Sequence, residues 1–174
     1  GANIKVVHMM EDIKKNVKDW TDEEEISAYL RAILNKEAFD KSGLIYGMGH
    51  AVYTISDPRA GILRKKAEEF AMGTEFEAEF RLLNNIEKLT PELFNEYKST
   101  PKKAMCANVD LYSGLVYHML DIPEEMYTPL FAIARVAGWC AHRIEEIMNM
   151  GKIIRPAYMS VREDRNYVPI DNRT

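Results

Sequence analysis

Apolar residues recur every three or four positions along most of this chain, and this spacing constrains its fold more than any other feature. The first such series starts close to the N-terminus and consists of Ile4, Val7, Met10, Ile13 and Val17. No stretch alternates apolar and polar residues for more than a few positions, so β-strands have little support. The spacing therefore predicts an all-α fold.

Residue pairs that commonly open helices mark where the next helices begin. Thr21 followed by Glu24 has the spacing of a capping box. Asp57-Pro58 combines an N-cap residue with a first-turn proline, and Thr90-Pro91 repeats that combination. We therefore expect a helix to start at each of these places.

Two more helices are predicted further along the chain. One runs from about Leu111 to Leu120, and a longer one starts at Thr128-Pro129 and continues to about Asn149. Residues 152–174 contain prolines among short mixed segments, which is typical of an extended tail.

Composition and charge narrow the class of protein. Hydrophobic residues make up 47% and charged residues 29% of the 174 positions, which is ordinary for one globular core. The net charge of −4, without a dense cluster of Lys and Arg, argues against nucleic acid or an anionic membrane as the main partner. The most apolar stretch, residues 130–141, contains Arg135 and is too short to span a bilayer.

The two cysteines give information on the redox state and cellular location of the protein. Cys106 and Cys140 have apolar neighbours and no CxxC spacing, so neither a disulfide framework nor a zinc site is expected. We expect both to be reduced core residues, and we expect the protein to be cytoplasmic.

The stretch GMGHAVYTISDPR, residues 47–59, gathers glycines, a histidine and an arginine around a helix start. Gly47 and Gly49 do not form a dinucleotide-binding loop, because Val52 stands where that motif needs its third glycine. From spacing alone, a plain turn between helices is favoured over a loop that approaches a ligand.

His50 and Arg59 in the same stretch have two interpretations. Arg59 lies in the first turn of the expected helix, where the helix dipole disfavours a cation, so its position indicates a nearby anion. A histidine near a helix N-terminus can bind an anionic ligand or serve a structural role. The two interpretations of this pair carry equal weight.

Arg135 stands among apolar residues of the long helix. Its neighbours at helical spacing include Phe131 and Trp139, and no acid follows before Glu145, so its face of the helix is expected to be buried. A buried guanidinium is costly without a partner. Either a protein carboxylate or a bound carboxylate or phosphate is therefore expected beside it.

Asp110 precedes an apolar run in CANVDLYSGL. Its commonest role at such a position is an N-cap, which is favoured over the alternative of a general base in a partly desolvated cleft. The other histidines, His8, His118 and His142, lack metal-ligand spacing, so no metal site is expected.

Taken together, four segments in this order resemble the citrate synthase family over essentially the whole chain. GMGHAVYTISDPR is similar to that family's GxGHxVY…DPR signature, and ANVDLYSG to its PNVD(F/L)YSG segment. LFAIARVAGWCAHRIEE is similar to its FAIAR(V/T)xGWxAH helix, and IIRPAYMSV to its RPxxxY tail. Gly1-Ala2-Asn3 matches the end of the family's HGGAN motif, whose histidine would lie upstream of Gly1.

The resemblance implies a function, namely the condensation of acetyl-CoA with oxaloacetate to citrate. It implies that Asp110 is the base that removes a proton from the acetyl group and that His50 polarises the ketone of oxaloacetate. Oxaloacetate would be bound by His50, Arg59, Arg135 and Arg155, the last contributed across a homodimer. Coenzyme A would be bound by Leu44, Ile45, Tyr46, Gly47, Met48, Lys103 and Asn108. Neither a metal nor a bound redox cofactor is implied.

The resemblance also implies a domain organisation. Residues 1–20 would end a large domain, residues 21–127 would form a mobile small helical domain, and residues 128–174 would return to the large domain as a helix and tail. Two positions depart from the family pattern. Thr54 stands where some members carry an arginine that contacts coenzyme A, and Ala107 replaces the usual proline before Asn108.

Two alternatives remain open at this stage. The first is a 2-methylcitrate synthase, which shares these motifs and accepts propionyl-CoA. The second is a helical binding or regulatory module that acts without the rest of the enzyme. If the chain is instead a C-terminal portion of a citrate synthase, we expect it to be inactive by itself, because the upstream histidine and much of the cleft belong to the remainder.

Overall fold

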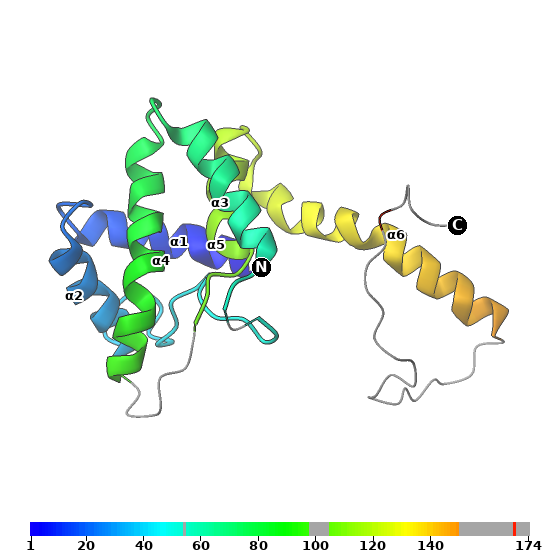
Figure 1. Ribbon diagram of the computed structural model, residues 1–174, viewed down its shortest axis with the longest axis horizontal. Helices are drawn as coiled ribbons and strands as arrows, with labels where there is room; N and C mark the ends of the chain where they lie inside the picture. The colour runs from blue at the N-terminus through cyan, green and yellow to red at the C-terminus, as the bar shows by residue number, and fades with distance from the viewer. Residues whose placement is uncertain (54, 98–104, 150–168, 170–174) are drawn as a thin grey trace. The chain divides into compact units, whose positions relative to one another are not determined.

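Helices make up all of the regular structure in the described part of the chain. The computed structural model describes residues 1–53, 55–97, 105–149 and 169. Its helices are α1 (Ala2–Asn16), α2 (Glu23–Leu34), α3 (Pro58–Ala71), α4 (Glu77–Tyr97), α5 (Asp110–Met119) and α6 (Tyr127–Met148), with a 3₁₀ turn at Glu124–Met126 (Figure 1). The predicted all-α fold is confirmed, and the described residues contain no β-strand, only an isolated bridge between Met48 and Ala107.

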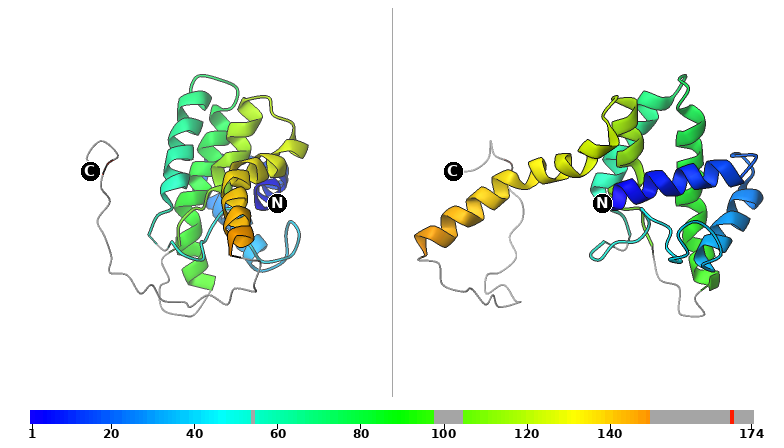
Figure 2. Two further views of the ribbon diagram at one scale, coloured as in Figure 1. Left: turned by 90° about the vertical axis from the view of Figure 1, so that its right-hand side faces the viewer. Right: turned by 180° about the vertical axis from the view of Figure 1, so that it is seen from behind.

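The chain divides into two compact units, Gly1–Ile133 and Ala134–Thr174. In the first unit α5 packs against α3 and α1, and α2 packs against α4. Figures 1 and 2 show α3, α4 and α5 running side by side with α1 crossing them. The core consists of apolar side chains from all of these helices, including Met9, Ile13, Ile26, Leu30, Ile33, Leu82, Ile86, Leu111 and Tyr112. Apolar residues that recur at helical spacing in the sequence therefore pack together in one hydrophobic core.

The local signals at the starts of α2 and α3 are only partly as predicted. The N-cap of α2 is Asp22 rather than Thr21, because its carboxylate accepts from the backbone N–H of Glu24 at 2.8 Å. The carboxylate of Glu25, three residues later, reaches back to the backbone N–H of Lys18 and Asp19. The predicted capping box is therefore not formed: the cap lies one residue later, and Glu25 binds the chain before it instead of the Asp22 N–H, which donates to the carbonyl of Asp19. The start of α3 is as predicted, with Asp57 as N-cap and Pro58 in the first turn.

Thr90-Pro91 does not start a helix, which corrects the prediction. Pro91 lies inside α4, and the Thr90 hydroxyl donates to the carbonyl of Ile86 at 2.6 Å. Proline removes one intrahelical hydrogen bond, but the buried face continues through it, with Ile86 before it and Leu93 after it both in the core. Packing against the other helices therefore outweighs the local breaking signal.

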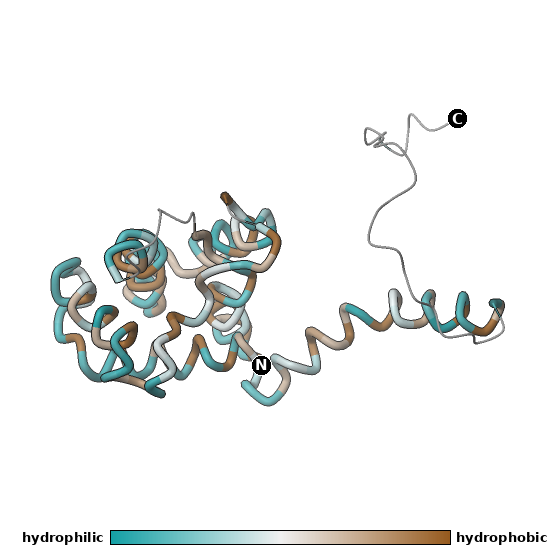
Figure 3. Tube along the Cα trace, turned by 90° about the horizontal axis from the view of Figure 1, so that it is seen from below, coloured by the Kyte–Doolittle hydropathy of each residue, from teal (hydrophilic) through white to brown (hydrophobic). Residues whose placement is uncertain are grey.

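The helix α6 begins and ends within one residue of its predicted bounds, but its predicted burial is wrong. Arg135 is exposed, Trp139 is 58% exposed, and Cys140, expected in the core, is exposed as well. Hydrophobic residues recur along the whole helix (Figure 3). The unit that starts at Ala134 contains no second described helix that could bury this face. The predicted tail, residues 152–174, lies outside the described residues except for Pro169.

Two further sequence predictions concern domains and membranes. The helix α1 packs within the same unit as α2 to α5. The predicted division into large-domain and small-domain segments at residues 20/21 and 127/128 stays a prediction about a complete enzyme. Among the described residues, no helix has both the length and the apolar character needed to cross a membrane.

The contact between α1 and α5 depends on Gly114. A Cβ atom built on Gly114 would lie 2.6 Å from a methyl carbon of Val7. We expect Gly114→Ala to lower the free energy of unfolding by about 1–3 kcal/mol, the usual cost of overpacking. A Cβ atom built on Gly61 in α3 would meet no atom within 4 Å, so Gly61→Ala should stabilise the fold by about 0.5–1 kcal/mol through helix propensity. Urea unfolding of both variants checks this, and equal effects would contradict the packing argument.

The start of α3 predicts an acid-dependent stability. Hydrogen bonds from the Arg59 side chain hold the pKa of the Asp57 carboxyl below its usual value of 3.8. A carboxylate with a lowered pKa in the folded state stabilises it above the unfolded-state pKa, and this contribution is lost as the pH falls through the lower folded-state value. We expect the stability of the wild type to fall more steeply than that of Asp57→Asn below about pH 4. Parallel denaturant titrations at pH 6 and below pH 4 measure the difference. Parallel pH dependences would exclude this role for Asp57.

Candidate functional site

Two segments distant in sequence pair with each other and bring the predicted catalytic residues into one region. The backbone N–H of Gly49 donates to the carbonyl of Cys106 at 2.8 Å, and the N–H of Asn108 donates to the carbonyl of Gly47 at 2.9 Å. Met48 and Ala107 face each other between these bonds. Because His50 directly follows one segment and Asp110 lies two residues after the other, the pairing joins the histidine loop to the start of α5.

Gly47 is required by this arrangement for two reasons. Its φ of +86° lies in the left-handed region, and a Cβ atom would come within 2.8 Å of the Leu111 side chain and 2.9 Å of its Cα. Packing of the turn directly on α5 therefore accounts for Gly47 without any ligand. Gly49 also has a positive φ, of +88°, but has open space where its Cβ would be.

His50 has a defined tautomer in its neutral form. Its Nδ1 accepts hydrogen bonds from the backbone N–H groups of Val52 and Tyr53, both at 2.9 Å. A nitrogen that accepts cannot carry the ring proton, so the neutral ring is protonated on Nε2. The Nε2 atom lies 3.3 Å from a guanidinium nitrogen of Arg59 and 3.8 Å from the Asp57 carboxylate. The guanidinium nitrogen is itself a donor and cannot accept this proton, and the His50 side chain is 18% exposed.

Arg59 is paired with a buried carboxylate, which sequence reasoning treated only as a helix cap. The Asp57 side chain is fully buried and accepts from the backbone N–H of Arg59 at 3.0 Å. It also accepts from Arg59 Nε at 3.0 Å and from Nη2 at 2.8 Å. This bidentate bond raises the pKa of Arg59 above its usual value, and nearby Asp110 adds a smaller contribution in the same direction. The anion that the position of Arg59 indicated is therefore, in the first place, Asp57.

The Arg59 pair still leaves binding capacity for a ligand. The side chain is 49% exposed, and its Nη1 donates to no residue in the part of the chain that the structure describes. A guanidinium presents donors in a planar fork that matches a carboxylate. The site can therefore take an anionic group beside the His50 Nε2 proton.

Asp110 is the first residue of α5 and not its N-cap, which corrects the favoured interpretation of this residue. The N-cap position belongs to Val109, which makes no side-chain cap hydrogen bond. The backbone N–H of Asp110 is instead met by the side-chain oxygen of Asn108 at 2.9 Å. Asp110 is the acidic residue in the first turn of α5, a position where the helix dipole favours an acidic side chain. The structure therefore does not assign Asp110 the capping role, and its function as a base stays a prediction.

The predicted coenzyme A residues fall into different environments. Leu44 is 55% exposed, whereas the Ile45 side chain is 6% exposed and belongs to the core. Tyr46 is half-buried and its hydroxyl donates to Asp40 at 2.8 Å. A small, largely apolar cavity of about 190 Å³ adjoins this loop and is lined by Leu34, Gly43, Leu44, Ile45, Met48, Thr90, Phe94 and Met105.

Several predicted site residues are not joined to this region by the structure. Lys103, Arg155 and the departure at Thr54 lie outside the described residues. Arg135 lies on α6 in the second unit and is exposed. The predicted roles of these residues in binding stay predictions.

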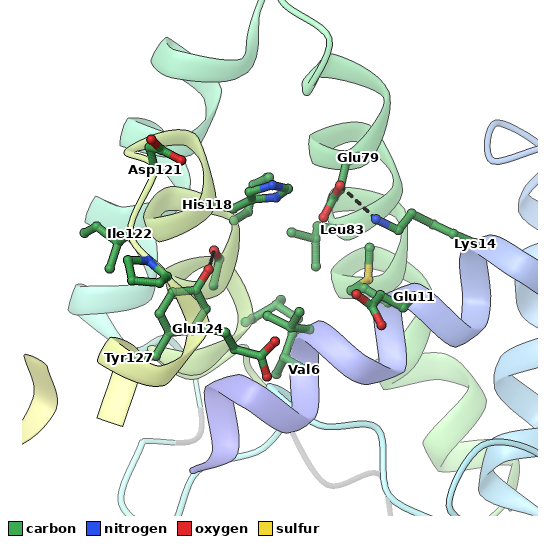
Figure 4. A pocket seen from close by; sticks show the side chains of 16 residues that line it. Val6, Glu11, Lys14, Glu79, Leu83, His118, Asp121, Ile122, Glu124 and Tyr127 are labelled. Atoms are coloured by element: carbon green, nitrogen blue, oxygen red, sulfur yellow. Dashed lines mark hydrogen bonds and ion pairs between the residues drawn. The ribbon is translucent and has the colours of Figure 1, made fainter. Parts of the chain in front are cut away.

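A larger cavity lies elsewhere in the first unit. It has a volume of about 330 Å³ between α1, α4, α5 and residues 121–127 (Figure 4). Lys14 and Glu79 form a 3.0 Å ion pair at its edge. None of the predicted site residues lines it. Among the described residues, no group of three or more His, Cys, Asp or Glu side chains could hold a metal ion.

Comparisons with known proteins agree on one family. Residues 1–157 match the model of the citrate synthase C-terminal domain. The citrate synthase of Synechocystis sp. is 37% identical over 99% of this chain and 39% of its own length. That of Acidithiobacillus ferridurans is 36% identical over 100% of this chain and 41% of its own length. The chain therefore spans about two fifths of the curated relatives that it matches.

The solved structures that resemble this chain are also citrate synthases. The crystal structure of citrate synthase from Thermotoga maritima has a TM-score of 0.65 and 32% identity, covering 100% of this chain and 42% of that one. Citrate synthase from Thermoplasma acidophilum, solved with carboxymethyl coenzyme A and oxaloacetate, has a TM-score of 0.64 and 28% identity, covering 99% and 42%. With the matched domain, the relatives and the fold in agreement, this chain belongs to the citrate synthase family.

Proposed function

We propose that this chain forms part of the active site of a citrate synthase, which condenses acetyl-CoA, oxaloacetate and water to citrate and coenzyme A. The observation that carries the proposal is the pairing of residues 47–49 with residues 106–108, which brings His50 and Arg59 into the neighbourhood of Asp110. The similar Thermoplasma acidophilum enzyme, solved with a coenzyme A analogue and oxaloacetate, supports these substrates.

Asp110 is proposed as the general base. It takes a proton from the acetyl methyl group, leaving an enol or enolate of the thioester. This proton is far too weakly acidic for a carboxylate in water, so the base must act together with a donor to the thioester oxygen and with exclusion of solvent. In the family that donor is the histidine of the HGGAN motif. Asp110 begins α5 and is not its N-cap, so the capping role does not compete with this one.

His50 is proposed to polarise oxaloacetate. Because Nδ1 accepts from the backbone, the Nε2 proton can donate to the ketone oxygen. The enolate carbon bonds to the ketone carbon, and the ketone oxygen becomes a hydroxyl after taking up a proton. Water then cleaves the thioester and releases coenzyme A. A donor aimed at the oxygen where charge develops stabilises this transition state most.

The remaining binding roles follow the family pattern. Arg59 would meet a carboxylate of oxaloacetate through its outward nitrogen, with Arg135 and Arg155 as further carboxylate ligands, Arg155 from across a homodimer. The loop of residues 44–48, with Lys103, would lie against coenzyme A. We propose no metal or bound redox cofactor, because the reaction transfers no electrons and hydrogen-bond donors supply the polarisation. A cytoplasmic location belongs to the same proposal.

The choice of acyl substrate tests the proposed function directly. A full-length enzyme containing this chain should release coenzyme A thiol from acetyl-CoA and oxaloacetate, and the 174 residues alone should not. A higher kcat/KM with propionyl-CoA would instead identify a 2-methylcitrate synthase. Specific binding of another protein by the 174 residues, with no thiol release by the full-length protein, would favour a binding module.

His50 and Asp110 should be separable by the step that each assists. In the full-length enzyme His50→Ala should lower kcat for citrate formation by about 10²- to 10³-fold, the usual effect of removing one donor to a developing oxyanion. It should also weaken oxaloacetate binding, whereas Asp110→Asn should lower kcat steeply and leave oxaloacetate binding nearly intact. Proton exchange from the methyl group of an acetyl-CoA analogue should survive His50→Ala better than condensation does. Equal losses of exchange and condensation in His50→Ala would show that its proposed role is wrong.

A further inference from the structure

We propose that Asn108 is a positioning residue, which holds His50 and Asp110 in the arrangement that the condensation needs. The proposal rests on the proposed function above for its kinetic consequences. It replaces the expectation that Asn108 mainly binds coenzyme A. Its basis is that one side chain connects the backbone segments that carry both catalytic residues.

Asn108 uses both ends of its side-chain amide within the chain. Its Nδ2 donates to the carbonyl of Gly49 at 2.8 Å, and its Oδ1 accepts from the backbone N–H of Asp110 at 2.9 Å. The Gly49 carbonyl belongs to the peptide plane that leads into His50, and the Asp110 N–H belongs to the plane that leads into Asp110. Asn108 therefore restrains the peptide from which each catalytic side chain extends.

Each of these two peptides depends on Asn108 for a hydrogen bond that nothing nearby replaces in the described structure. Gly49 has no side chain to pack, and its Cβ position faces open space, so hydrogen bonds are its main restraint. The helix α5 receives no side-chain bond from its own N-cap residue, Val109. An orphan N–H at a helix start is met here by the residue before the cap.

The chemistry of the amide explains why this position needs asparagine. A single amide offers a donor and an acceptor in a fixed plane. An aspartate could still accept from the Asp110 N–H, but it could not donate to the Gly49 carbonyl. An alanine could do neither. The variants Asn108→Asp and Asn108→Ala thus remove one connection and both connections, respectively.

The expected signature is a loss of kcat rather than of substrate affinity. Misplacing catalytic groups by about 1 Å can cost about 10²-fold in rate. In the full-length enzyme we therefore expect Asn108→Ala to lower kcat about 10²-fold and to leave KM for acetyl-CoA nearly unchanged. Asn108→Asp should also lower kcat, because the link to Gly49 is lost. Should either variant keep its kcat and raise KM for acetyl-CoA, Asn108 binds the coenzyme and the proposal is overturned.

A matched control separates positioning from general stability. Asn85 also donates its side-chain amide to a distant backbone carbonyl, that of Trp20 at 3.3 Å, but it lies outside the site. Asn85→Ala should keep the wild-type kcat. The loss caused by Asn108→Ala should also be smaller in a His50→Ala background, since Asn108 acts partly through His50. Equal fold losses in both backgrounds would overturn the proposal.

Amide hydrogen exchange tests the geometry without any assay of activity. In Asn108→Ala the Asp110 amide should exchange faster than in the wild type, and in Asn108→Asp it should stay protected. Unchanged protection in Asn108→Ala would overturn the positioning role even if the enzyme is a citrate synthase. If the wild-type enzyme forms no citrate, the proposed function fails, while the exchange data still decide whether Asn108 holds the two segments.

Discussion

The pairing of residues 47–49 with residues 106–108 is the contact on which the site depends. It consists of two backbone hydrogen bonds and the bond from the Asn108 side-chain Nδ2 to the carbonyl of Gly49. Without it the loop that carries His50 would have little to fix it, because Val52 and Ile55 beyond it are 76% and 90% exposed. The pairing therefore holds the loop around His50 against the start of α5, which is itself packed into the helical core.

A second constraint is the charge balance at the start of α3. A fully buried carboxylate is costly unless it is paired and hydrogen-bonded. Asp57 meets that requirement with three hydrogen bonds from Arg59, one from its backbone and two from its guanidinium. The same pair orients the guanidinium beside His50. One buried acid thus caps the helix, fixes an arginine and leaves part of that arginine exposed for a ligand.

The sequence predicts those features that depend on neighbouring residues. Asp57-Pro58 is read correctly because capping involves only the next few residues, and the helices at α1, α5 and α6 follow from their own periodicity. The prediction that a helix starts at Thr90-Pro91 is wrong because α4 continues through Pro91, where residues before and after the proline pack into the core. The link from Asn108 to Gly49 spans 59 positions, so no local pattern could reveal it. The burial expected for Arg135 also depends on contacts beyond its own helix.

The departure at Ala107 fits the same ladder. In an antiparallel pair, residues that face each other between two hydrogen bonds direct their own N–H groups away from the partner. Met48 and Ala107 are such a pair, and the N–H of Ala107 donates to no residue in the described ranges. Proline, which lacks that N–H, would therefore cost the ladder no hydrogen bond at this position. At position 107, alanine and the family's proline are therefore equivalent for the pairing. Asn108, the next residue, makes one backbone and two side-chain hydrogen bonds, and an alanine at position 108 would keep only the backbone bond.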